Sequence, residues 1–148
     1  DRDVTGVQTC ALPICQNEED FSKDFYNNYY RTGDYGTIDK DGFVSLKSRI
    51  KELINVGGKK VSPIEVEEVL NKFEGIAESA CIGVEDPVYG EVVKVLVVGS
   101  LTSDDNERIK KYMSSLLESH MVPAQIEHIA ELPKTHNGKI QRLLLKDI

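Results

Sequence analysis

The stretch that decides the fold is SPIEVEEVLNKFEGIAESACIGVEDPVYGEVVKVLVVG, residues 62–99. Its start predicts a helix, because Ser62 can cap the amino terminus, a proline suits the first helical position, and Glu65 follows three places after the serine. Apolar residues then recur at helical spacing until a glycine ends the pattern. Residues 76–84 and 91–99 are rich in β-prone side chains, and they predict two strands separated by a loop.

The residues after this stretch add one further helix and a short strand. Residues 102–121 are amphipathic and predict a helix, which the Val-Pro pair after it stops. Residues 125–130 predict a short strand and residues 132–138 a loop. Residues 140–148 predict the beginning of a last helix.

The residues before it predict a hairpin and a connector. Asp41-Gly42 stands between two β-prone runs, which is a strong hairpin signal, and Gly57-Gly58 interrupts the connector that follows. The predicted fold class is therefore α+β: a small mixed or antiparallel sheet flanked by helices and preceded by a β-hairpin.

Composition excludes several classes of protein. The chain has 148 residues and a formal net charge of −7, which argues against nucleic acid as a partner because phosphate binding needs a basic face. No apolar run reaches the length of a membrane-spanning helix. Its three cysteines have neither metal-ligand spacing nor the even number of a disulfide framework, which favours a reducing, cytoplasmic setting.

The amino-terminal segment does not fit the rest. Residues 4–14, VTGVQTCALPI, back-translate without a mismatch to a string that resembles a widely used sequencing-library adapter, and the next adapter base fits a cysteine codon at Cys15. We therefore interpret residues 1–15 as an adapter-derived artefact and exclude them from the fold. We expect the gene to be truncated at this point.

Three stretches carry residues suited to nucleotide chemistry, and each alone has a plain alternative. YRTGD, residues 30–34, places a carboxylate that can bind a ribose diol, although an ordinary turn is the commoner reading. Residues 49–63, RIKELINVGGKKVSP, contain paired glycines that let the backbone approach a ligand and lysines that could bind phosphate. The alternative is a glycine hairpin whose lysines are solvated. PKTHNGKIQR, residues 133–142, places a lysine after an Asn-Gly turn, or is simply an exposed turn.

Taken in order, the three stretches and the DPVYGE segment at 86–91 resemble the motifs of the adenylate-forming superfamily. The resemblance runs from about residue 28 to residue 142, and the acyl-CoA synthetase branch is nearest, because VSPIEVE and PKT follow its wording. In that superfamily an enzyme activates a carboxylic acid with ATP and then transfers the acyl group.

The resemblance implies a role for six residues. Asp34 would bind the ribose of ATP and AMP, and Arg49 would contact the same nucleotide. Lys139 would be the catalytic lysine of adenylation, bridging the attacking carboxylate and the α-phosphate.

The other three roles concern the change between the two reaction steps, the binding of CoA and the binding of phosphate. Lys51 would be the hinge about which the lid swivels between the two steps. Gly58 would lie beside the pantetheine tunnel, and Lys60 is a weaker candidate for the phosphates of the nucleotide or of CoA.

The resemblance also implies a domain organisation. Residues 16–49 would be the tail of a large amino-terminal AMP-binding domain, and residues 50–148 a mobile carboxyl-terminal lid. The expected substrates are a carboxylic acid, ATP and CoA, with Mg²⁺ bound mainly by the large domain and no metal site in this chain. The chain alone would be inactive, and its oligomeric state stays open. Two alternatives remain: a lid from an enzyme that loads a carrier protein, and a non-catalytic stand-alone binding module.

Overall fold

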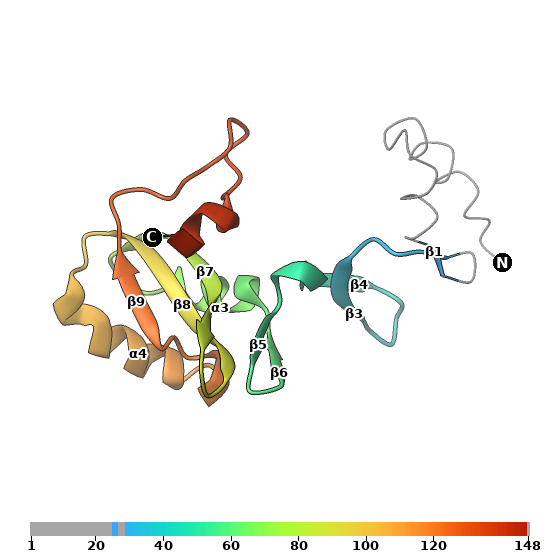
Figure 1. The fold of residues 1–148 in the computed structure, drawn as a ribbon, viewed down its shortest axis with the longest axis horizontal. Coiled ribbons are helices and arrows are strands. Elements are labelled where there is room, and N and C mark those ends of the chain that lie inside the picture. Colours follow the sequence, from blue (N-terminus) through green and yellow to red (C-terminus); the bar gives the residue numbers. More distant parts are fainter. Residues whose placement is uncertain (1–24, 27–28, 148) are drawn as a thin grey trace. The chain divides into compact units, whose positions relative to one another are not determined.

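A computed structural model describes residues 25–26 and 29–147 (Figure 1). The chain divides into two compact units, residues 1–34 and 35–148. In the first unit, β1 (Phe25–Tyr26) pairs antiparallel with β2 (Tyr29–Tyr30). The segment interpreted as adapter lies outside the described residues. Among the described residues, no helix is long and apolar enough to cross a membrane.

The predicted hairpin at Asp41-Gly42 is confirmed. It consists of β3 (Asp34–Ile38) and β4 (Val44–Arg49), which form a two-stranded sheet. Asp39 organises the turn, since its Oδ1 accepts hydrogen bonds from the backbone N–H groups of Asp41 and Phe43, both at 2.9 Å. Gly42 takes a φ of 86°, a left-handed conformation that glycine adopts without strain.

The main sheet has five strands in the order β6-β5-β8-β7, with β9 beside β8. The strands are β5 (Ile54–Val56), β6 (Lys59–Val61), β7 (Ile76–Asp86), β8 (Gly90–Gly99) and β9 (Gln125–His128). The long β7–β8 hairpin is antiparallel, with Ala80 opposite Leu96, whereas β9 runs parallel to β8. The sheet is thus mixed, as the sequence predicts.

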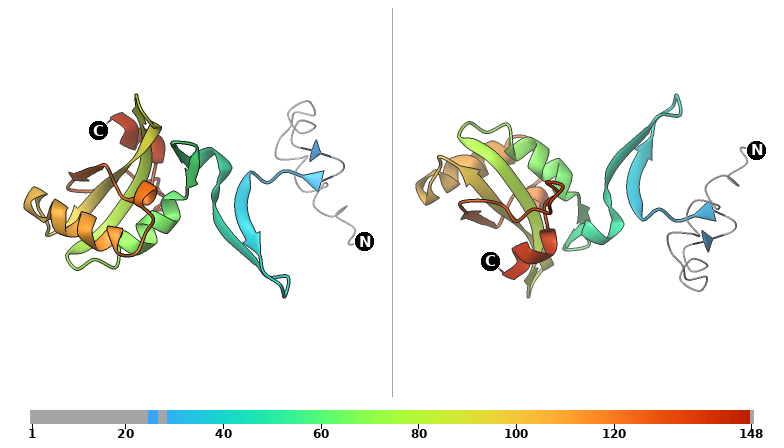
Figure 2. Two further views of the ribbon diagram at one scale, coloured as in Figure 1. Left: turned by 90° about the horizontal axis from the view of Figure 1, so that it is seen from below. Right: turned by 90° about the horizontal axis from the view of Figure 1, so that it is seen from above.

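Both faces of the sheet are covered, which explains the nearly continuous apolar run of β8. Figure 2 shows helices α3 (Pro63–Leu70) and α4 (Asn106–Ser114) on one face, and the carboxyl-terminal 3-10 helix η4 (Arg142–Asp147) on the other. The helix-covered face buries Val66, Leu70, Val93, Val95, Val97, Ile109 and Met113. The opposite face buries Ala80, Ile82, Leu96, Leu132 and Leu145.

The helix that begins after Ser62 is confirmed at its amino terminus. Ser62 has an extended backbone, its Oγ accepts from the N–H of Glu65 at 3.5 Å, and Pro63 occupies the first turn. The same Oγ donates to the carbonyl of Lys47 at 2.9 Å, which joins α3 to β4. One serine therefore starts the helix and fastens the hairpin to it.

The second predicted helix is shorter than the amphipathic pattern suggests. Residues 103–105 form a 3-10 turn, η2 (Ser103–Asp105), and α4 ends at Ser114. At that end, the hydroxyls of Ser114 and Ser115 donate to the carbonyls of Lys110 and Tyr112, both at 2.7 Å. Such bonds compete with the helical ladder and favour termination. A separate 3-10 turn, η3 (Ser119–Met121), follows. The helix predicted to begin within residues 140–148 is the 3-10 helix η4.

Candidate functional site

Lys139 lies in a tight loop between β9 and η4. The backbone of Thr135 donates to the carbonyl of Lys139 at 2.8 Å, and the Lys139 N–H donates to Thr135 Oγ1 at 3.1 Å. Gly138, with a φ of 78°, makes the turn, and an isolated antiparallel bridge between Lys134 and Ile140 closes its base. The backbone of Lys139 is thus fixed on both sides while its side chain is exposed.

The two lysines of this loop have different surroundings. Lys134 Nζ contacts both carboxylate oxygens of Glu78, at 2.5 and 2.7 Å, so its charge is already paired. Within residues 25–26 and 29–147, no ion pair joins Lys139 to a carboxylate. Lys139 is therefore the cation of the loop that can meet an anion from outside.

The Gly57-Gly58 stretch is a hairpin turn between β5 and β6. Both glycines have positive φ, 57° and 86°, as a two-residue hairpin turn with left-handed central residues requires. Gly57 donates from its N–H to the carbonyl of Tyr89 at 2.9 Å, which ties the turn to the β7–β8 loop. A side chain at Gly58 would meet nothing within 4 Å, so this turn is open to a ligand.

The remaining predicted residues occupy connecting positions. Asp34 begins β3, and its N–H donates to Thr32 Oγ1 at 3.2 Å. Arg49 ends β4, and Lys51 lies in the 3-10 turn η1 (Ile50–Glu52) that follows directly. Lys60 is exposed in β6, paired across the hairpin with Asn55.

The lysine loop and the glycine turn are anchored at opposite ends of one strand. Lys134 binds Glu78 near the start of β7, whereas Gly57 binds Tyr89 just beyond its end at Asp86. At about 3.3 Å per residue, the two ends of this segment are separated by roughly 25 Å. The structure thus does not bring Lys139 and Gly58 together.

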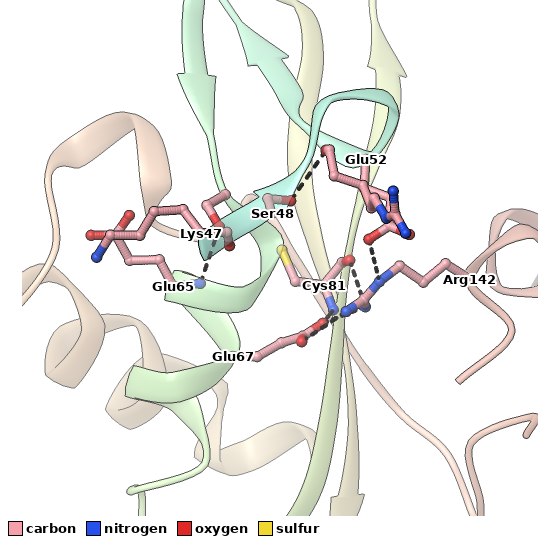
Figure 3. Close-up of polar contacts among 9 residues, drawn as sticks. Lys47, Ser48, Glu52, Glu65, Glu67, Cys81 and Arg142 are labelled. Carbon is pink, nitrogen blue, oxygen red and sulfur yellow. Dashed lines mark hydrogen bonds and ion pairs between the residues drawn. The ribbon is translucent and has the colours of Figure 1, made fainter. Parts of the chain in front are cut away.

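The sequence analysis gave no role to a charged cluster at the outer edge of β7. Glu67, from α3, accepts the N–H of Cys81 at 2.6 Å and binds Arg142 in a bidentate pair, Nη1 at 2.5 Å and Nη2 at 3.0 Å (Figure 3). Arg142 also donates to the Cys81 carbonyl at 3.4 Å, and its Nε lies 3.4 Å from Glu52 Oε2. A signal existed in the sequence, because Glu52, Glu67 and Arg142 all fall within the quoted motifs.

The electrostatics of this cluster follow from burial. Burial raises the pKa of the Cys81 thiol, and the charge of Glu67 adds to this shift while that of Arg142 opposes it. Burial by itself would lower the pKa of Arg142, but hydrogen bonds and charge from Glu67, aided by Glu52, leave that pKa raised. The cluster therefore holds a protonated thiol and a permanently charged guanidinium.

The described residues do not supply a metal centre. Within them, no group of three or more His, Cys, Asp or Glu side chains is arranged to hold a metal ion.

Comparison with known proteins gives the family that the sequence motifs resemble. Residues 65–139, half of the chain, match the AMP-binding enzyme C-terminal domain. The chain is 40% identical over 134 residues to oxalate–CoA ligase of Saccharomyces cerevisiae, covering 88% of the chain and 24% of that protein. Among solved structures, ATP-bound MatB of Rhodopseudomonas palustris matches with a TM-score of 0.80 and 30% identity over 88% of the chain and 26% of MatB.

A second solved structure is the o-succinylbenzoate CoA synthetase of Bacillus subtilis in complex with an acyl-adenylate intermediate. It matches with a TM-score of 0.79 and 31% identity, over 86% of the chain and 26% of that protein. The chain thus spans about a quarter of the length of the relatives that it matches. It belongs to the family of AMP-binding enzyme C-terminal domains.

Proposed function

We propose that this chain is the carboxyl-terminal part of an ATP-dependent acid–CoA ligase, with residues 50–148 as its mobile lid. The observation that carries the proposal is Lys139: its backbone is fixed by Thr135, its side chain is exposed, and its neighbour Lys134 is already paired with Glu78. Two of the similar proteins, an oxalate–CoA ligase and an o-succinylbenzoate CoA synthetase, support this class of reaction.

In the proposed first half-reaction, a carboxylate oxygen of the substrate attacks the α-phosphorus of ATP. The bond to the β-phosphate breaks, and pyrophosphate leaves with its electron pair. Two anions must approach each other, so an ammonium group placed between them by Lys139 stabilises the transition state, by a few kcal/mol in a site closed to water. Asp34 is assigned to the ribose hydroxyls and Arg49 to the same nucleotide, while Mg²⁺ is assigned to the large domain.

In the proposed second half-reaction, the thiol of CoA releases its proton to solvent and its sulfur attacks the acyl carbon. The acyl–oxygen bond breaks, and AMP leaves with the electron pair. Gly58 is assigned to the pantetheine, since its turn is open, and Lys60 to nearby phosphates. Lys139 and Gly58 are anchored at opposite ends of β7, so one fixed orientation of the lid cannot present both to the same substrate. A rotation about Lys51 between the steps satisfies both assignments.

We infer that residues 16–49 belong to a larger preceding domain. On the β3–β4 hairpin, the exposed fractions of Ile38, Val44 and Leu46 are 73%, 63% and 70%. Such exposure is unusual for apolar strand residues, and it fits a surface that another part of the protein covers. We assign the binding pocket for the acyl substrate to the larger domain. A cytoplasmic setting stays a prediction from the cysteine usage.

The test compares this chain with the intact ligase, meaning the chain joined to the domain that precedes it in its gene. The isolated chain should give no ATP–pyrophosphate exchange with any carboxylic acid, whereas the intact ligase should exchange and then form an acyl-CoA. Exchange by the pure isolated chain would contradict the proposed division of the active site. Absence of CoA consumption by an intact protein that does exchange would favour a carrier-protein acceptor.

A further inference from the structure

The ion pair between Glu67 and Arg142 is the fixed part of the cluster in Figure 3. Their side chains are only 12% and 20% exposed, and both oxygens of the carboxylate are engaged by the guanidinium. Because they also satisfy the N–H and carbonyl of Cys81, they occupy the backbone groups that a further strand would use at the edge of β7. Removing one partner would leave a buried charge uncompensated.

Arg142 also stands at the base of the lysine loop. Directly before it, Gln141 donates from its N–H to the carbonyl of Pro133 at 2.9 Å, next to the bridge between Lys134 and Ile140. The anchored guanidinium therefore fixes the point at which the loop carrying Lys139 returns to the sheet.

The same guanidinium also contacts Glu52, which lies in the connector, the segment of residues 50–53 between β4 and β5. The Nε–Oε2 distance is 3.4 Å, and the Glu52 side chain is 36% exposed, so this contact is looser than the pair with Glu67. A partly open pocket of about 120 Å³ lies beside η1, and its lining includes Lys51, Glu52, Leu53, Cys81 and Arg142. The connector is thus incompletely packed here, and a charge contact carries more of its attachment than it would in a filled interface.

We propose that Arg142 is a positioning residue that latches the connector, at Glu52, to the frame that holds the Lys139 loop. Glu52 and Arg142 both follow Lys51, so they move together when the lid rotates, and the latch confines the rotation to the backbone before Glu52. The coupling to catalysis rests on the proposed function of Lys139 and Lys51; the latch itself does not.

The latch can be tested on the 148-residue chain without any enzymatic activity. Leu53 donates its N–H to the carbonyl of Ile50 at 3.3 Å, so amide hydrogen exchange at Leu53 reports opening of η1. Glu52→Gln removes the charge at nearly constant shape, and Glu68→Gln, an exposed glutamate of α3, is the matched control. We expect exchange at Leu53 to become about two- to fivefold faster in Glu52→Gln, the range that one partly exposed ion pair provides, with amides in β8 unchanged.

High salt supplies a second arm of the same measurement. In 1 M NaCl, where the Debye length is about 3 Å, the original chain should approach the behaviour of Glu52→Gln at Leu53. If Leu53 exchanges equally in Glu52→Gln and Glu68→Gln, the latch does not exist, whatever the enzyme does.

The coupling is tested in the intact ligase by measuring both half-reactions separately. Without the latch the rotation would spread into the residues after Lys51, so thioester formation, which follows the rotation, should slow more than adenylation in Glu52→Gln. If Glu52 and Arg142 only stabilise the fold, Glu52→Gln should lower both rates by the same factor. Arg142→Lys, which keeps the charge but not the bidentate geometry, should then lower both rates equally as well. A change at Leu53 with uniform loss of both rates would retain the latch and overturn its coupling to the reaction.

Discussion

Lys134 Nζ lies 2.5 Å and 2.7 Å from the two carboxylate oxygens of Glu78, which ties the stem of the lysine loop to the start of β7. This contact gives the two lysines of the loop distinct tasks. Lys134 fixes the stem, and Lys139, at the turn itself, is the lysine that we propose contacts the substrate. A matched pair of substitutions follows from this division.

Lys139→Ala in the intact ligase should lower the rate of adenylation by about 100-fold or more, with little change in ATP affinity, because the lost ammonium acts mainly on charge that develops in the transition state. Single-turnover pyrophosphate release measures this. Lys134→Ala is the control and should cost much less. If acyl-CoA formation from synthetic acyl-adenylate fell as far as adenylation in Lys139→Ala, the assigned role would be wrong.

The glycine turn permits a test that separates backbone strain from obstruction. Gly58 has a φ of 86°, which asparagine tolerates better than leucine does. Gly58→Asn should therefore fold like the parent and report only the side chain, whereas Gly58→Leu adds strain. We expect both to slow thioester formation, with leucine the more severe, and to leave adenylation largely intact. Equal losses in both half-reactions in a normally folded Gly58→Asn variant would remove Gly58 from the CoA site.

A proline at the proposed hinge addresses the rotation directly. Lys51→Pro fixes φ near −65° in the middle of η1 and stiffens the connector. Adenylation should persist while acyl-CoA formation drops by an order of magnitude or more. Single-turnover measurement of pyrophosphate beside acyl-CoA checks this, with circular dichroism of the variant as the folding control. Unchanged acyl-CoA formation would place the hinge elsewhere.

Ser62 should be important for stability because its hydroxyl serves two elements. Ser62→Ala removes the cap of α3 and leaves the Lys47 carbonyl without its 2.9 Å donor. The free energy of unfolding, measured by urea denaturation of the chain, should fall by about 1–2 kcal/mol. Ser114→Ala, at the exposed end of α4, is the control and should change it by less than about 0.5 kcal/mol. Equal effects would show that the cap is not what anchors the hairpin.

The raised pKa of Cys81 predicts an unreactive thiol whose alkylation responds abnormally to pH. A free thiol titrates near 8.5, so between pH 7 and 9 the unfolded chain should alkylate progressively faster. In the folded chain the raised pKa keeps Cys81 protonated across that range, and the rate should stay low and nearly flat. Iodoacetamide labelling in a background with Cys10 and Cys15 replaced by serine measures Cys81 alone. A folded-state rate that rises with pH as in urea would show that Cys81 is accessible.

Local chemistry was sufficient to predict much of this fold. The Ser62 cap, the turn at Asp41-Gly42 and the strands β7 and β8 were predictable because each depends on residues close together in sequence. The length of α4 was not, since Ser114 and Ser115 compete for backbone carbonyls within an otherwise good amphipathic pattern. The parallel pairing of β9 with β8 depends on contacts distant in sequence.

The candidate site shows the same limit. The loop that presents Lys139 could be located from its Asn-Gly turn and its motif. The sequence could not show that Lys134 is paired and Lys139 is not, because Glu78 is distant in sequence and meets Lys134 only in the folded chain. The Glu67–Arg142 pair was hidden for the same reason, although both residues stood inside quoted motifs.

The exposed apolar residues of the β3–β4 hairpin also determine how this chain behaves in concentrated solution. In the part of the chain that the structure describes, β3 and β4 pair with no strand beyond each other, and Ile38, Val44 and Leu46 lie exposed on them. An edge of this kind recruits further strands from other molecules. The purified chain should therefore self-associate at high concentration through this hairpin. Its solubility should then be limited by this association more than by unfolding of the domain that follows.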